Sequence, residues 1–284
     1  MRKILFYFIL CLLPFYYVNA QSFLLPSRPR VDSVLAPFFH GVASGDPLTD
    51  RIIIWTRVTT LDPSVDVDWQ MATDTGFLSV VNSGTFTTDS SFDYTVKVDV
   101  TGLQPNNWYY YRFKAYNRYS ITGRTRTLPI GNVDSLRIAF FSCSDFQAGY
   151  FNVYHDIANR NDIDMVMHLG DYYYEYAASA SDTNRLHPET HDALSLTDYR
   201  LWNSEYKLDP DLRALFQQYP WIQIWDDHDV ANNSWETGAQ NHNPATQGSY
   251  IARKDASFKA YFEWLPIREQ APGNDSIIHR AFKW

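Results

Sequence analysis

Short apolar runs with turn residues between them dominate the chain from residue 37 to about residue 130. The clearest runs are 51–56, 66–69, 94–98 and 108–113, and each is long enough for one strand. Short strands at such intervals are typical of an all-β sandwich, and the length suits a fibronectin type III-like or immunoglobulin-like module. The pattern therefore predicts a β-sandwich domain at 37–130. Its aromatic residues are interpreted as cross-strand pairs and core in preference to a ligand-binding face.

The pattern changes at residue 135, where apolar runs begin to alternate with segments of helical period. Strands are predicted at 136–141, 163–169 and 221–225. Helices are predicted at 150–158, at 197–206 with Thr197 as cap, from Asp209 or Asp211 to 219, and at 249–264 before Pro266. Strands that alternate with helices indicate βαβ units and a parallel sheet. Residues 135–284 are therefore predicted to form an α/β domain.

Polar residues gather directly after each of these three strands, at 142–145, 170–175 and 226–233. In open α/β sheets, sites are built in the crevice outside the carboxyl ends of the strands. Carboxylate and imidazole groups at that edge are suitable ligands for divalent and trivalent metals. The three clusters therefore predict a metal centre, of the kind found in phosphoesterases.

Two neighbouring metals need a shared carboxylate, and together they can hold a phosphoryl oxygen and activate water. Asp171 is interpreted as that bridge, because it follows a strand and Gly170, although such a pair taken alone is usually an ordinary turn. Tyr174 suits a phenolate ligand if the metal is ferric, against the simpler interpretation as an amphipathic tyrosine.

The run 226–229 follows a strongly apolar strand, so a solvated charge run explains it poorly. Asp227, with Asn232 or Asn233, is predicted to supply oxygen ligands to the second metal, and a catalytic part is assigned to Asp227 as well. His228 suits a general acid for the leaving alkoxide, or a donor to the developing phosphoryl charge.

Residues 1–20 have the form of a cleaved signal peptide, with basic residues, an apolar core and a small-x-small site that predicts cleavage after Ala20. The chain is therefore expected to be secreted or periplasmic, with residues 21–36 as an N-terminal arm and no transmembrane anchor. The formal charge of −8 becomes more negative on cleavage, which disfavours nucleic acid or an anionic membrane as a partner.

Cys143 is the one cysteine left after that cleavage, because Cys11 lies inside the predicted signal. An odd cysteine in an oxidising compartment is an inert buried thiol, half of an intermolecular disulfide, or a metal ligand. Its place directly after a predicted strand, beside the other polar clusters, favours the ligand.

These blocks together resemble the N-terminal portion of the alkaline phosphatase D (PhoD-like) family of secreted metallophosphoesterases. The resemblance covers nearly the whole predicted mature chain, and it rests on Ser-Cys at 142–143, Gly-Asp-Tyr-Tyr-Tyr-Glu at 170–175, Trp-Asp-Asp-His-Asp at 225–229 with the asparagines at 232–233, and the stretches 39–47, 54–57 and 261–268. It implies an α/β metallophosphoesterase, a βαβ-built sheet sandwich that is C-terminally incomplete, preceded by the β-sandwich domain.

The resemblance also implies a phosphoric ester hydrolase (EC 3.1) acting on phosphomonoesters or phosphodiesters, with Fe³⁺ and Ca²⁺ as cofactors. Cys143, Asp171 and Tyr174 would hold iron, Asp171 would bridge to calcium, and Asp227 with Asn232 would complete the calcium side. Other divalent metals remain candidates.

Arg253 and Arg268 are candidate phosphate-binding arginines, against the simpler interpretation as partners in salt bridges. Relatives in this family take further Asp and His ligands from a C-terminal segment, and none of the blocks found here corresponds to it. The competing hypothesis is a non-catalytic exported binding module with a degenerate phosphoesterase domain. The sequence leaves open the substrate, which could be a monoester, a diester such as teichoic acid or phospholipid, or a nucleotide, and it leaves open the oligomeric state.

Overall fold

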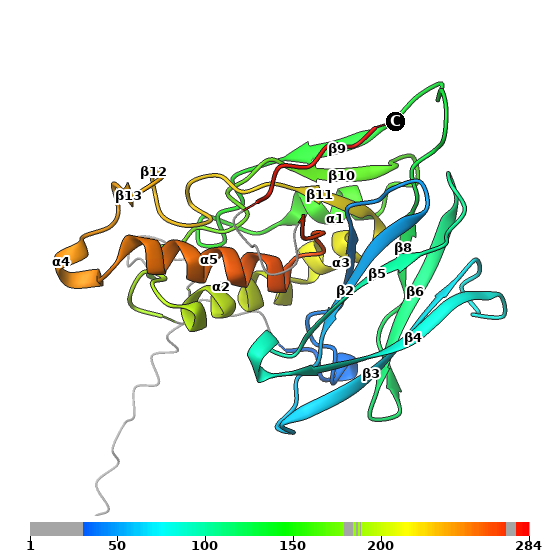
Figure 1. Cartoon of the computed structure of the whole chain (residues 1–284), viewed down its shortest axis with the longest axis horizontal. Helices are drawn as coiled ribbons and strands as arrows, with labels where there is room; N and C mark the ends of the chain where they lie inside the picture. The colour runs from blue at the N-terminus through cyan, green and yellow to red at the C-terminus, as the bar shows by residue number, and fades with distance from the viewer. Residues whose placement is uncertain (1–30, 179–183, 186, 188, 271–276, 284) are drawn as a thin grey trace, which may run out of the picture.

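The computed structural model of the chain describes residues 31–178, 184–185, 187, 189–270 and 277–283 (Figure 1). The predicted signal peptide 1–20 and most of the arm 21–36 lie outside the described residues. No helix in the described part of the chain is both long and apolar enough to cross a membrane.

The N-terminal part is entirely β apart from two short 3-10 turns. Its strands are β1 (Val42–Gly45), β2 (Arg51–Arg57), β3 (Ser64–Ala72), β4 (Val80–Asp89), β5 (Thr95–Thr101), β6 (Trp108–Ala115), β7 (Arg118–Tyr119) and β8 (Gly123–Arg126). One layer has the order β4-β3-β6-β7, with β8 also paired to β6. Residues in β6 alternate between buried and half-buried positions, as expected for a strand with one face on a core. The apolar face of this layer packs on β1, β2 and β5.

The four strands predicted in this region are present. Strand β4 was not predicted, because seven of its ten residues are Thr, Ser, Asn, Asp or Gly and its burial is slight. Pairing with β3 over nearly its whole length is what makes it a strand.

The second part contains the predicted alternation of strands and helices. The strands are β9 (Ile138–Phe141), β10 (Met165–His168), β11 (Pro220–Gln223), β12 (Ser234–Trp235) and β13 (Gly238–Ala239), and the helices are α1 (Asn152–Ala158), α2 (Leu196–Leu208), α3 (Pro210–Gln218), α4 (Pro244–Gln247) and α5 (Tyr250–Trp264). Strands β9, β10 and β11 are parallel neighbours, which confirms the predicted parallel sheet.

The helix starts follow from local capping. Asp209 caps α3 by accepting from the backbone N–H groups of Asp211 and Leu212, and Pro210 occupies the first helical position. Helix α2 starts earlier than predicted: Ser195, and not Thr197, is the cap, and it forms a capping box with Asp198.

One six-stranded sheet runs through both parts of the chain, in the order β5-β2-β1-β11-β10-β9. The junction is a parallel pairing of β1 with β11, extended by the hydrogen bond from Asp46 N–H to the Trp221 carbonyl. Helices α1, α2, α3 and α5 pack against one face of the sheet around a core rich in tyrosine and tryptophan (Figure 1). The β-sandwich and the α/β part are therefore joined edge to edge by backbone hydrogen bonds.

The opposite face of β9–β11 is more open. Phe140, Met167 and Ile222 are paired neighbours across the three strands and form one row, and Phe140 is 72% exposed. Leu169 and Ile224 lie just beyond the strand ends and are also exposed.

Candidate metal centre

Three loops meet at the carboxyl ends of β9, β10 and β11, as the sequence predicts. Cys143 N–H donates to the Gly170 carbonyl and Ser144 N–H to the Asp171 carbonyl, so the first two loops are joined through their backbones. Cys143 is exposed, which excludes the inert buried thiol. Its side chain faces the loop after β10, with Sγ 3.5 Å from Asp171 Oδ2.

Gly170 is required by its surroundings. Its φ is +108°, and a Cβ there would lie 2.6 Å from the backbone N and the Cβ of Asp226. The missing side chain therefore lets the loop after β10 touch the loop after β11. This contact brings Asp171 beside residues that are more than fifty positions later in the chain.

The Asp229 side chain forms hydrogen bonds with the backbones of the same two loops. Its carboxylate accepts the backbone N–H groups of Asp171 and Tyr172 at 2.9 and 3.0 Å, and that of Asp226 at 2.8 Å. Burial raises the pKa of Asp229, but donors to both oxygens favour the ionised form, because a carboxyl OH would meet an N–H. Asp229 thus acts as a buried anionic clamp.

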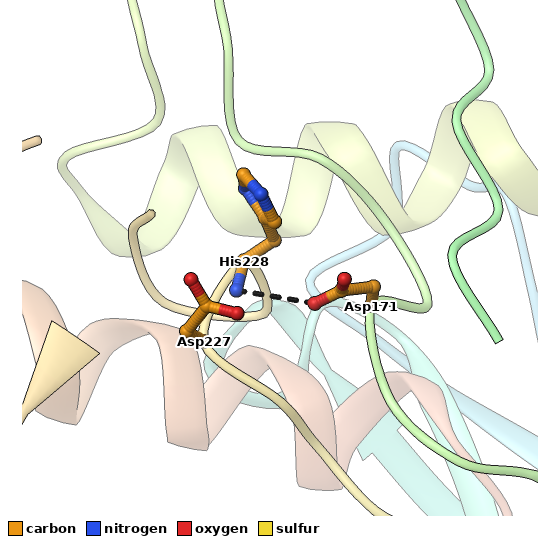
Figure 2. A group of neighbouring side chains, drawn as sticks. All are labelled: Asp171, Asp227 and His228. Atoms are coloured by element: carbon orange, nitrogen blue, oxygen red, sulfur yellow. Dashed lines mark hydrogen bonds between the residues drawn. The ribbon is translucent and has the colours of Figure 1, made fainter. Parts of the chain in front are cut away.

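Metal-binding atoms converge on Asp171. Tyr174 OH lies 3.3 Å from its Oδ2, the same oxygen that Cys143 approaches, and His228 N–H donates to its Oδ1 at 3.3 Å. Asp171, Asp227 and His228 each offer a ligand atom within 4.8 Å of the others. Figure 2 shows the two carboxylates on either side of the His228 backbone, with the imidazole extending away from them.

The pKa values of Tyr174 and Asp171 are raised in a way that a cation bound between them would offset. Burial, followed by the charge on Asp171, raises the pKa of Tyr174. Burial also raises the pKa of Asp171, with further upward contributions from Asp227 and Asp226. A cation at this place would offset both effects, because it would balance the carboxylates and favour the phenolate. The donor set of thiol, phenol and carboxylate therefore fits a metal.

His228 lies at the side of the centre. Its Nδ1 is 2.8 Å from Glu175 Oε2, and its ring packs at 4.2 Å against Tyr174 and at 5.2 Å, edge on, against Tyr176. Burial lowers its pKa, but the Glu175 hydrogen bond and the nearby carboxylates outweigh it, so the pKa is raised. The position suits a proton donor, and Nε2 remains a candidate ligand atom as well.

The two asparagines lie together beside Asp227. Asn233 N–H donates to Asp227 Oδ2, and the side-chain amides of Asn232 and Asn233 both donate to Gln240 Oε1. With the amide nitrogens engaged, each side chain keeps its oxygen as the donor atom for a cation. Both asparagines therefore stay candidates for the second metal.

Arg253 does not lie where a substrate could reach it. It is 1% exposed, and it donates to Tyr199 OH at 3.0 Å and to the Asn241 carbonyl at 2.7 Å. The expectation of substrate binding is corrected accordingly: Arg253 supports the loop that carries Asn241. Arg268 forms a salt bridge with Asp99 and donates to the Asp46 carbonyl, which is the structural alternative.

Glu175 and Asp229 received no role from the sequence, although both lie in the polar clusters. Each is an acidic residue in a short polar stretch, one after a run of tyrosines and one after a histidine. Such a stretch has no hydrophobic periodicity that would indicate whether the carboxylate is buried or exposed. Their burial, at 0% and 1% exposed, is what distinguishes them.

The loops at the carboxyl ends of the parallel strands thus bring a carboxylate, a phenol and a thiol together, a donor set that a metal could use. The profile described as "PhoD-like phosphatase" matches residues 138–284, and "PhoD-like phosphatase, N-terminal domain" matches residues 26–129. The chain belongs to the PhoD-like phosphatase family.

Two relatives show the extent of the similarity. The chain is 36% identical to alkaline phosphatase D of Bacillus subtilis (strain 168) over 282 residues, covering 94% of this chain and 47% of that protein. The solved structure titled "Structure of PhoD" superposes with a TM-score of 0.78 at 36% identity, covering 86% of this chain and 48% of that one. The chain thus spans about half the length of the relatives it matches.

Proposed function

We propose that the chain is, or is part of, an exported metal-dependent phosphatase or phosphodiesterase that hydrolyses phosphate esters. The observation that carries the proposal is the convergence of the Cys143 thiol and the Tyr174 phenol on one oxygen of Asp171. Membership of the PhoD-like family supports the reaction class. The signal-like residues 1–20 support export.

We assign Fe³⁺ to Cys143, Asp171 and Tyr174, and Ca²⁺ to Asp171, Asp227 and Asn232, with Asn233 as the alternative to Asn232. Thiolate and phenolate favour iron, whereas carboxylate and amide oxygens favour calcium. When bound, such metals supply Lewis acidity that lowers the pKa of water. The family profiles also support the division into a β-sandwich part at 37–130 and a catalytic part from 135.

In this proposal the side chains bind the cations, position the His228 ring and donate a proton. Asp171 and Asp227 supply negative charge that holds the cations, and Tyr174 limits the movement of the His228 ring through direct packing. His228 donates a proton from Nε2 to the leaving oxygen of the ester, because its Nδ1 is already engaged by Glu175.

The direct test is hydrolysis by the purified chain after loading with Fe³⁺ and Ca²⁺. Nitrophenyl phosphate, bis-nitrophenyl phosphate and an alkyl phosphate should be compared, with Asp171→Asn as the inactive control. We expect turnover that a chelator abolishes and that Asp171→Asn lacks. A chain that retains both metals and hydrolyses none of the three esters contradicts the proposal for this chain.

His228→Ala separates chemistry from metal binding. The variant should keep its metals and lose about two to four orders of magnitude in kcat on the alkyl phosphate, the usual loss for a general acid. The loss should be smaller on nitrophenyl phosphate, whose leaving group needs little protonation. Equal losses on both esters, or a loss of metal, would make His228 a ligand or a phosphate anchor instead.

A further inference from the structure

A buried carboxylate lies directly behind His228. Glu175 is fully buried, and both of its oxygens are engaged. Oε2 is 2.8 Å from His228 Nδ1, while Oε1 accepts the Asn232 backbone N–H at 2.7 Å and the Asn241 side-chain amide at 3.3 Å. With these partners and no exposed surface, Glu175 is not a group that touches a substrate.

The hydrogen bond determines which ring nitrogen of His228 is available. A carboxylate can only accept, so the proton in this bond belongs to Nδ1. That leaves Nε2 as the nitrogen that can exchange a proton with a substrate. The flanking rings of Tyr174 and Tyr176 restrict rotation of the imidazole and hold Nε2 on the side away from Glu175.

We propose that Glu175 is a positioning residue that orients His228 for proton donation. It also holds the start of the asparagine pair through the Asn232 backbone. The inference rests on the proposed function. As the ester P–O bond breaks, its electron pair goes to the leaving oxygen, which takes the Nε2 proton. The Nδ1 proton stays in the bond to Glu175 throughout.

Glu175→Gln is the sharpest variant because it keeps shape and one oxygen. The Gln oxygen can still accept from Asn232 and Asn241, so its NH₂ faces His228 Nδ1 and must donate. Nδ1 then becomes an acceptor, and the remaining ring proton moves to Nε2. The variant thus changes the tautomer with little change in packing.

The first measurement uses the chain without metal. Heteronuclear NMR of the histidine rings should show a protonated, hydrogen-bonded Nδ1 for His228 in the wild type, assigned by its loss in His228→Ala. In Glu175→Gln the Nδ1 should become unprotonated, while the other histidine signals stay in place. An unchanged His228 signal in Glu175→Gln overturns the proposal regardless of catalytic activity.

The second measurement is a double-mutant cycle on the metal-loaded chain with an alkyl phosphate. Glu175→Gln alone should lower kcat by about 10- to 100-fold, the usual effect of removing an orienting partner, with metal content unchanged. In the His228→Ala background the same change should cost less than about threefold, because residues that act as a unit are not additive. An equal loss in both backgrounds overturns the proposal, since it would mean that Glu175 acts through the fold.

Asp192→Asn is the matched control. Asp192 accepts from the same Asn241 amide at 3.0 Å, whereas the carboxylate that hydrogen-bonds to His228 Nδ1 is Glu175. It should leave kcat within about threefold of wild type, and a loss as large as that of Glu175→Gln would attribute the effect to the Asn241 loop. If His228→Ala itself has no effect on any ester, the proton-donor role of His228 fails. If His228→Ala lowers kcat and Glu175→Gln does not, only the inference about Glu175 fails.

Discussion

Two candidate iron ligands hold left-handed backbone conformations. Cys143 has φ of 59° and Asp171 has φ of 51°, and neither is a glycine. Such conformations cost on the order of 1 kcal/mol or more each and persist where surrounding contacts enforce them. Here the two backbone hydrogen bonds that Cys143 and Ser144 donate to the loop after β10 enforce them. The result is that the thiol and the carboxylate face each other.

Colour tests the ligand set at the residue scale. A ferric phenolate should give the iron-loaded chain a visible charge-transfer band that Tyr174→Phe removes, with little change in stability because Tyr174 is only half-buried. Cys143→Ser should lose iron and activity while the fold persists. The absorption spectrum and metal analysis report both, with Tyr176→Phe as control. A colourless, active chain containing only zinc would contradict the assignment, and unchanged iron in Cys143→Ser would remove the thiol from the ligand set.

At the scale of elements, the centre depends on how two loops are held together after their strands end. Strands β10 and β11 are adjacent, but hydrogen bonds of the sheet end near His168 and Gln223. Beyond that point, Gly170 permits contact and Asp229 supplies the acceptor for both loops. The contact between the two loops therefore depends on the absence of a side chain at Gly170 and on the buried carboxylate of Asp229.

Asp229→Asn should be strongly destabilising, although it is nearly isosteric. One carboxylate oxygen becomes an NH₂ that faces a backbone N–H, so a charged hydrogen bond is lost and a donor is left unsatisfied. We expect a loss of about 3 kcal/mol in the free energy of unfolding, measured by urea denaturation, together with weaker metal uptake. The neighbouring exposed Asp226→Asn is the control and should change stability by less than about 1 kcal/mol. Equal urea midpoints for the two variants would refute the role of Asp229.

At the scale of the molecule, the β-sandwich and the α/β part share one sheet and a buried polar junction. Asp46, fully buried in the loop after β1, accepts from Arg268 N–H at 2.7 Å and pairs with Arg280 at 2.9 Å. His40, just before β1, bonds Ser204 of α2 at 2.8 Å and packs edge-on to Trp264 of α5. These contacts join residues near the start of the described chain to helices α2 and α5 and to residues 268 and 280.

Because His40 is buried, we expect the free energy of unfolding to decrease in mild acid. Burial, aided by the charges of Arg57, Lys207 and Arg213, lowers its pKa well below 6.5 in the folded chain. Below pH 6.5 the unfolded chain takes up a proton that the folded chain does not, so stability present above pH 6.5 falls as the pH drops. One such group contributes at most about 1.4 kcal/mol per pH unit.

The measurement is the free energy of unfolding in urea between pH 7.5 and 5. His40→Gln should flatten the dependence relative to wild type. His168, whose pKa burial lowers to about 3, retains its own contribution of the same sign. The control is His155→Gln, which replaces an exposed histidine and leaves the buried ones in place. A slope in His40→Gln equal to that of wild type would show that His40 does not titrate with unfolding.

The sequence by itself determined the order of most of the longer strands and helices and the place of the candidate metal centre. Apolar runs, caps and the polar residues after each strand are local signals, and a parallel sheet brings the carboxyl ends of its strands to one edge. Cys143, Asp171, Tyr174 and the 226–233 cluster were therefore predictable as neighbours. Their individual roles as ligands remain predictions.

Only the tertiary structure decided how the two parts join and which charges are buried. The pairing of β1 with β11 connects residues 44 and 220, and Glu175 meets His228 across fifty-three positions. The same kind of long-range packing places Arg253 in the interior, against the expectation that it binds substrate. Local sequence carries no signal for these contacts, because desolvation of a charged side chain depends on what packs over it and not on its neighbours along the chain.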